Sequence, residues 1–154
     1  MVMAMDTYSQ DTLQHIAFSF REAIIQVIKD NAFSGTLLRS FPKGNCSYVS
    51  ELLQKYYLFE CGIETYQVAG HRKNDMTHEW LETADGTVID ITGDQFPERQ
   101  GIIVYVGLRD SFYNSFIEHA RQRVDEEDLY DPFPSCFELE KKKNYDSIVS
   151  RMIL

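Results

Sequence analysis

Four short segments rich in β-branched and aromatic residues follow one another in the middle of the chain, with helical patterns on both sides. Such residues favour the pleated, half-buried surface of a sheet, and turn-forming residues separate the segments. We therefore expect strands at residues 64–69, 78–83, 87–92 and 102–106. Placed so close along the chain, these strands predict an antiparallel meander.

Helical periodicity marks the two flanks of this meander. We expect helices at residues 11–31, 46–59 and 111–124, and from Phe137 onward. Asp11 is a candidate N-cap for the first helix, and Gly62 can end the second. Helices first, a meander next and helices last predict one α+β domain over residues 1–154.

The charge balance limits the partners that this chain can have. It carries 24 acidic and 15 basic side chains, a formal net charge of −9. Nucleic-acid backbones and anionic membranes attract basic surfaces, so we expect neither as the main partner. The three lysines 141–143 are interpreted as a solvated helix face. The longest apolar run, residues 102–106, is far too short to span a membrane.

The cysteine count bears on the compartment. Three cysteines are an odd and sparse set, which does not indicate a disulfide framework and fits a reducing environment. The N-terminal stretch MVMAMDTYSQ lacks the positive region and apolar run of a secretory signal. We expect a soluble, cytoplasmic protein, and we interpret the acidic segment 125–132 as a solvated loop rather than a metal site. The oligomeric state stays open.

Cys46 stands at the start of the second helical pattern, in the run GNCSYVSELL. The first turn of a helix carries the positive end of the macrodipole and unpaired N–H groups, which favour the nucleophilic thiolate. Gly44 allows a tight turn before the helix, and Asn45 is a suitable N-cap. Cys61 lies at the opposite end of the helix and Cys136 has no visible activating neighbour, so we interpret both as packing.

The segment MTHEWLETADGTVIDITGDQF predicts a β-hairpin that carries His78 and Asp90. A three-residue turn that ends at Gly86, with positive φ there, would pair Leu81 with Ile89. His78 and Asp90 would then share one face as diagonal neighbours, within reach of an imidazole–carboxylate hydrogen bond. A two-residue turn would place them on opposite faces.

The chain thus offers a nucleophile, a base and an orienting carboxylate in the order Cys46, His78, Asp90. Taken alone, His78 would more often be a surface or half-buried histidine, and Asp90 a turn or cap residue. A mid-strand aspartate between two isoleucines, however, needs a polar partner to offset its desolvation. Together the three residues favour a catalytic interpretation.

This arrangement resembles the transglutaminase-like branch of the papain-like cysteine enzymes. The resemblance rests on three features: the run GNCSYVSELL, the histidine of THEWLE 32 residues after Cys46, and the aspartate of VIDIT 12 residues after that histidine. The resemblance covers residues 42–96, about a third of the chain. It implies a papain-like or transglutaminase-like core, in which the nucleophile helix packs on an antiparallel sheet. Cys46 would be the nucleophile, His78 the general acid/base and Asp90 the orienting carboxylate.

The family includes peptidases, amidases, glutamine deamidases, transglutaminases and acyltransferases, small bacterial members among them. The resemblance therefore implies acyl transfer from an amide bond of a peptide or protein substrate, through a thioester, without a metal or organic cofactor. In many papain-like enzymes a glutamine before the cysteine helps to hold the oxyanion, and the residues just before Cys46 include none. Gln95 and Asn45 are candidate substitutes. Trp80, on the His78 face, either walls the acyl pocket or, slightly favoured, fills the core.

Two other functional classes remain open. A catalytically silent binding or regulatory module on the same fold would keep these residues for structure alone. A metal hydrolase would use Cys46, His78 and Asp90 as zinc ligands, although no close-spaced ligand pair such as C-x-x-C is present.

Overall fold

The computed structural model describes residues 8–124 and 139–154 of the chain, in which helices flank and cover a sheet. The helices are α1 (Gln10–Lys29), α2 (Cys46–Cys61), α3 (Ser111–Asn114) and α4 (Leu139–Val149). The strands are β1 (Tyr66–Arg72), β2 (Met76–Glu82), β3 (Val88–Asp90), β4 (Tyr105–Gly107) and β5 (Ile117–Gln122). Short 3₁₀ turns are η1 (Lys73–Asp75), η2 (Gly93–Gln95) and η3 (Pro97–Arg99). The α+β class that the sequence predicts is confirmed.

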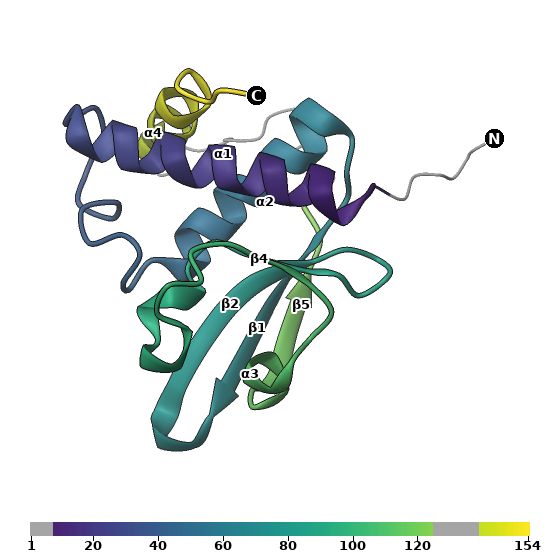
Figure 1. Cartoon of the computed structure of the whole chain (residues 1–154). Coiled ribbons are helices and arrows are strands. Elements are labelled where there is room, and N and C mark those ends of the chain that lie inside the picture. The colour runs from purple at the N-terminus through teal and green to yellow at the C-terminus, as the bar shows by residue number, and fades with distance from the viewer. Residues whose placement is uncertain (1–7, 125–138) are drawn as a thin grey trace.

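The five strands form one antiparallel sheet in the order β4-β3-β2-β1-β5. Strands β1 to β4 are the expected meander, and β5 joins the other edge of the sheet beside β1 (Figure 1). The strand bounds differ from the expected ones by a few residues. In particular, β4 begins at Tyr105, so residues 102–104 precede the strand rather than belong to it.

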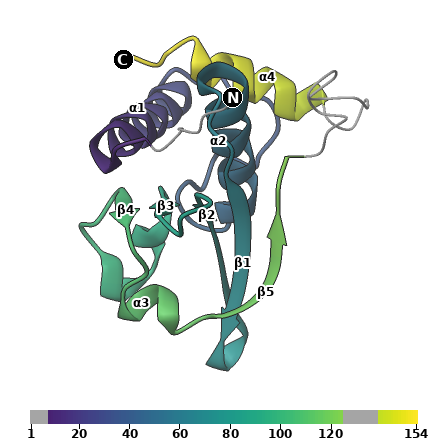
Figure 2. The ribbon, with the colours of Figure 1, turned by 90° about the vertical axis from the view of Figure 1, so that its right-hand side faces the viewer.

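The sheet separates two apolar cores. Successive strand residues point to opposite faces, so Trp80 and Leu81, neighbours on β2, enter different cores. The larger core joins Leu81 and Ile89 to the buried faces of α1, α2 and α4. The smaller core is an aromatic cluster around Trp80 to which α3 contributes. Figure 2 shows α1, α2 and α4 gathered at one end of the molecule and α3 at the other.

The helix ends follow from local capping. The N-cap of α1 is Ser9 rather than the expected Asp11, because the Ser9 hydroxyl accepts a hydrogen bond from the backbone N–H of Thr12 at 3.1 Å. Asp11 lies instead in the first turn, where its charge faces the positive end of the helix. Helix α2 ends as predicted at Gly62, which adopts a left-handed φ of 68°.

The prediction of one helix over residues 111–124 is wrong. Only Ser111–Asn114 is helical, and Ile117–Gln122 pairs with β1 as strand β5. The apolar spacing weakens after Phe116, whereas the strand gains ladder hydrogen bonds along the free edge of β1. In the strand conformation, Arg121 Nη2 also donates a hydrogen bond to Glu82 Oε1 at 2.9 Å. Tertiary pairing here outweighs local helix preference.

Some expectations lie outside the described residues: those on Cys136, on the acidic segment 125–132 and on residues 137–138. Within α4, Lys141 is not simply solvated, because it forms an ion pair with Glu51 of α2 at 3.0 Å. No helix in the described part of the chain is long and apolar enough to cross a membrane.

Candidate active site

The hairpin has the register that the sequence predicts. The backbone N–H of Thr83 donates to Thr87 O at 2.9 Å, Gly86 adopts a φ of 89°, and Leu81 pairs with Ile89. A three-residue turn therefore places residues of even number, from β2 and β3 alike, on one face.

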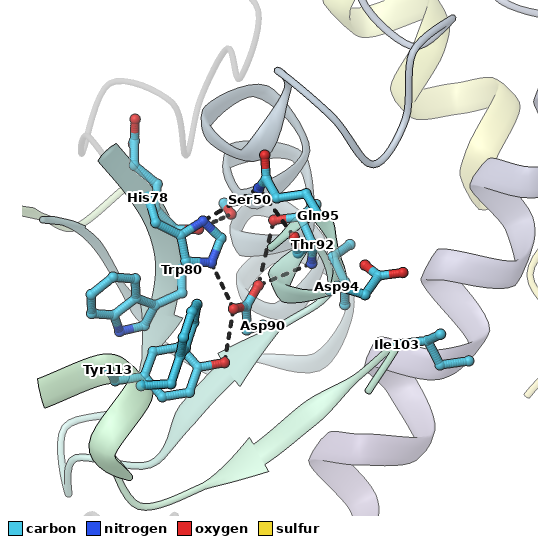
Figure 3. Close-up of polar contacts among 12 residues, drawn as sticks. Ser50, His78, Trp80, Asp90, Thr92, Asp94, Gln95, Ile103 and Tyr113 are labelled. Atoms are coloured by element: carbon cyan, nitrogen blue, oxygen red, sulfur yellow. Dashed lines mark hydrogen bonds and ion pairs between the residues drawn. The ribbon is translucent and has the colours of Figure 1, made fainter. Parts of the chain in front are cut away.

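His78 and Asp90 meet on that face. His78 Nε2 donates to Asp90 Oδ2 at 2.7 Å, and both side chains are buried (Figure 3). The other carboxylate oxygen, Oδ1, accepts from the backbone N–H of Thr92 at 2.9 Å. Burial acts to raise the pKa of Asp90, but the charge of His78 and the donated hydrogen bonds outweigh it and lower the pKa. Asp90 is thus an ionised carboxylate in the protein interior.

The same contacts set the charge of His78. Burial acts to lower the pKa of the imidazole, but the Asp90 carboxylate, with a smaller contribution from Cys46, raises the pKa to about 9. The Asp90 carboxylate thus favours the charged form of His78.

Cys46 lies at the other side of this imidazole. It is the first residue of α2, which packs on β2, and its partly exposed side chain lies close enough to His78 to raise the pKa of the imidazole. Because Nε2 already binds Asp90, the ring nitrogen left for Cys46 is Nδ1. Strand β3 pairs with β2 only at Leu81 and Glu82, so no residue of β3 pairs with His78 through the backbone. The three candidate residues thus form the series Cys46–His78–Asp90.

The two cysteines of α2 have different surroundings. Cys61 is the last residue of the helix, where burial and the nearby Glu60 carboxylate raise the pKa of its thiol. No imidazole is among the groups that shift it. Cys61 is therefore an internal control for the reactivity of the Cys46 thiol.

The turn before Cys46 differs from the expectation in one respect. Gly44 adopts a φ of 75°, as a tight turn requires, and Asn45 occupies the N-cap position. Asn45 is therefore the N-cap residue, as expected, but its side chain makes no capping hydrogen bond. Its Nδ2 donates instead to Leu37 O at 2.9 Å, which ties down the preceding loop.

Gln95 is better placed than Asn45 to act beside the nucleophile. It lies on η2, the turn that follows Asp90, and its Nε2 is 3.4 Å from His78 Nδ1. The same amide donates to Thr92 O at 3.1 Å, which orients it. Gln95 therefore lies at the nitrogen of the imidazole that Asp90 does not bind.

Trp80 is a core residue. It is 1% exposed, its Nε1 donates to Glu82 at 2.9 Å, and its ring packs 5.6 Å from His78 and 5.2 Å from Tyr113. Of the two roles considered for Trp80, this burial supports packing beneath the imidazole.

Two contacts of the site had no counterpart in the sequence analysis. The Tyr113 hydroxyl donates to Asp90 Oδ2 at 2.8 Å, and Arg21 of α1 forms a largely buried ion pair with Asp94 at 2.9 Å. No local pattern signals Tyr113, since residues 111–124 read as a helix. Arg21 carried a weak signal, because it stands beside Phe20 on the face of α1 that is otherwise apolar.

The arrangement can supply nucleophilic chemistry. Three groups are in series, so the imidazole can pass a proton to or from the thiol while the carboxylate holds its charge. Within residues 8–124 and 139–154, no three His, Cys, Asp or Glu side chains gather where they could hold a metal ion. Comparison with known proteins gives no match: no family model, no curated protein and no solved structure matches the chain.

Proposed function

We propose that this protein is a cysteine-dependent acyl-transfer enzyme that acts on amide bonds of a peptide or protein. The observation that carries the proposal is a helix-start thiol placed beside a buried imidazole that is itself hydrogen-bonded to a buried carboxylate. A carboxylate kept ionised in the interior requires compensation, which an imidazolium provides, and the Cys46 side chain lies beside that imidazole.

We propose further that the fold is a papain-like or transglutaminase-like core. The support is the packing of α2 on an antiparallel sheet, with Cys46 at its start and with His78 and Asp90 on adjacent strands in that chain order. The sequence run from GNCSYVSELL to VIDIT adds the resemblance described above.

The first half of the reaction forms a thioester. The Cys46 thiolate attacks the carbonyl carbon of the amide, and the oxyanion is held by the backbone N–H of Cys46 and by Gln95 Nε2. The His78 imidazolium gives its Nδ1 proton to the leaving nitrogen, the C–N bond breaks and an amine departs. His78 is then neutral, and Asp90 keeps its ring oriented.

The second half returns the enzyme to its starting state. Neutral His78 takes a proton from water or from an acceptor amine, which attacks the thioester carbon. The C–S bond breaks, the acid or the new amide leaves, and the thiolate–imidazolium pair is restored. The rings of Phe96, Phe112 and Phe116, 5.0, 6.0 and 5.9 Å from the imidazole, exclude water around His78 and so strengthen its electrostatic attraction to Asp90.

Selective alkylation tests this proposal. Iodoacetamide at pH 6.5 should label Cys46 at least about tenfold faster than Cys61, because Cys46 lies beside the His78 imidazole at a helix start whereas Cys61 lies beside the Glu60 carboxylate at a helix end. His78→Ala should remove the preference. Peptide mapping by mass spectrometry gives both rates in one sample. Equal, slow labelling of the two cysteines would instead support a catalytically silent module on this fold.

Thioester trapping then identifies the reaction. Incubation with p-nitrophenyl acetate should acetylate Cys46, and a peptide pool should leave an acyl adduct on the same residue. Cys46→Ser is the control for adducts elsewhere. Full turnover by Cys46→Ala would exclude the mechanism.

A further inference from the structure

Two hydrogen bonds end on the same oxygen of the Asp90 carboxylate. Tyr113 Oη donates to Asp90 Oδ2 at 2.8 Å, and His78 Nε2 donates to that oxygen at 2.7 Å. Figure 3 shows Asp90 between these two side chains, with Thr92 at its other oxygen. The carboxylate therefore cannot turn without breaking one of these bonds.

Tyr113 is held in this position from several sides. It is fully buried on α3, and the N-cap carboxylate of Asp110 accepts from its backbone N–H. Its ring packs 5.2 Å from Trp80, and the Arg99 guanidinium lies 5.4 Å above it. The hydroxyl thus reaches Asp90 from an element that follows the hairpin in the chain and is not part of it.

The space beside the shared oxygen admits no additional side chain. A β-carbon on Gly93 would lie 2.9 Å from Asp90 Oδ2 and 3.7 Å from Tyr113 Oη. A carbon at 2.9 Å from an oxygen requires something to shift. The chain therefore places a residue without a side chain where the hydroxyl and the carboxylate meet.

We propose that Tyr113 is a positioning residue of this site: its hydroxyl fixes the Asp90 oxygen that holds His78 and weakens the pull of that oxygen on the imidazolium. A donor that shares a carboxylate oxygen disperses part of its negative charge, so the imidazolium gives up its proton more readily. The catalytic consequence rests on the proposed function, in which His78 must release and regain a proton in every cycle.

Among the described residues, few charged or titratable groups face the His78 imidazole or the Tyr113 hydroxyl. Asp90 and Cys46 face His78, and Asp90 and Arg99 face the Tyr113 hydroxyl. Arg72 lies behind the aromatic rings that surround His78, 5.1 Å above Phe96 and 4.8 Å above Phe116. Burial and the Asp90 charge raise the pKa of Tyr113 well above its ordinary value, so its hydroxyl stays a donor when His78 titrates.

Tyr113→Phe tests the inference, because it removes the hydroxyl and keeps the ring. The pKa of His78, followed by NMR through the Hε1 resonance that disappears in His78→Gln, should rise by about half a unit to one unit. After acetylation with p-nitrophenyl acetate, hydrolysis of the acetyl-enzyme at pH 7 should slow by about three- to tenfold, since less His78 is neutral. The rate should approach that of the wild type at alkaline pH, which a loss of folding would not produce.

Tyr105→Phe is the matched control. Its hydroxyl donates to Leu108 O at 2.5 Å, and its ring packs 5.2 Å from Tyr113. Although Tyr105 pairs with Asp90 through the backbone, the change removes only a hydroxyl that bonds elsewhere, so it should leave the titration of His78 unchanged. Placing 3-fluorotyrosine at position 113 supplies a second test, since a stronger donor of the same shape should lower the pKa of His78.

The outcomes separate this inference from the proposed function. An unchanged or lowered pKa of His78 in folded Tyr113→Phe, or no lowering with 3-fluorotyrosine, overturns the role of Tyr113. If p-nitrophenyl acetate does not acetylate Cys46 in the wild type, the proposed function fails. The NMR titration then still decides whether Tyr113 sets the charge of the His78–Asp90 pair.

Discussion

At the scale of single residues, the molecule depends on one buried carboxylate. Asp90 stands between Ile89 and Ile91 in the sequence, yet both of its oxygens accept hydrogen bonds in the folded chain. A charge so placed is stable only with its partners present, and its main partner is the imidazolium of His78. The pair thus links the stability of the fold to the protonation of the candidate catalytic base.

Removing the Asp90 carboxylate should therefore affect both activity and stability. Asp90→Ala leaves the His78 imidazolium buried and unpaired, which should cost about 3–5 kcal/mol in the free energy of unfolding at pH 6, measured with urea. Acylation of Cys46 should fall but not vanish, whereas Cys46→Ala and His78→Ala should abolish turnover in folded protein. A variant Asp90→Ala as stable and as active as the wild type would contradict this account of the pair.

The pH dependence of stability follows from the raised pKa of His78. Its pKa rises from 6.5 in the unfolded chain to about 9 in the fold, so the folded state binds the proton more tightly. The resulting stabilisation is complete below pH 6.5 and is lost as the pH rises through 9. Urea unfolding of the wild type and of His78→Gln should show the difference between them shrink by about 3 kcal/mol between pH 6 and pH 10. A constant difference would mean that His78 is not charged in the fold.

At the scale of elements, the hairpin and the nucleophile helix could be predicted from the sequence because their signals are local. The strand period and the turn that ends at Gly86 together fix the face shared by His78 and Asp90. The start of α2 at Cys46 follows from the apolar spacing after Gly44. Strand β5 could not be predicted, because its pairing with β1 is decided by an edge formed about fifty residues earlier. Tyr113 was missed for the same reason: only the fold brings α3 beneath the hairpin.

A buried ion pair ties α1 to the turn that carries Gln95. The two guanidinium nitrogens of Arg21 bind the two oxygens of Asp94 at 2.9 Å, and Nη1 also donates to Ile91 O at 2.6 Å. The same guanidinium lies 5.0 Å above the ring of Phe41, in the loop before Cys46. Arg21 therefore contacts two segments next to the site: the turn that carries Gln95 and the loop that precedes Cys46.

Breaking this pair should destabilise the protein more than removing it whole. Asp94→Leu leaves the buried guanidinium of Arg21 without its carboxylate partner and should lower the free energy of unfolding by about 3–5 kcal/mol. The double variant Arg21→Met/Asp94→Leu should recover part of this loss. The exposed pair Lys142–Asp146 on α4, at 2.8 Å, is the control, and Lys142→Ala should change stability by less than about 1 kcal/mol. A double variant less stable than Asp94→Leu would show that the guanidinium stabilises the fold without its partner.

At the scale of the whole molecule, the candidate site straddles the two cores. Cys46 begins a helix of the larger core, and His78 is enclosed by the aromatic rings of the smaller one. The two cores share the strands of one sheet, since β2 sends Leu81 into one and Trp80 into the other. Neither core can lose its packing without disturbing the strand that the other also uses, so the site should exist only when both are formed.

A single cooperative transition is the expected consequence. Trp80 is the only tryptophan of the chain and lies in the smaller core, whereas the helical signal in far-UV circular dichroism comes mainly from the larger one. Urea unfolding followed by these two probes should give coincident curves. The preference of iodoacetamide for Cys46 over Cys61 should disappear along the same curve, because it requires the helix start and the imidazole together. If the Cys46 preference persisted after the Trp80 signal had changed, the smaller core would not be needed for that reactivity, and His78 would lose its assigned part in activating the thiol.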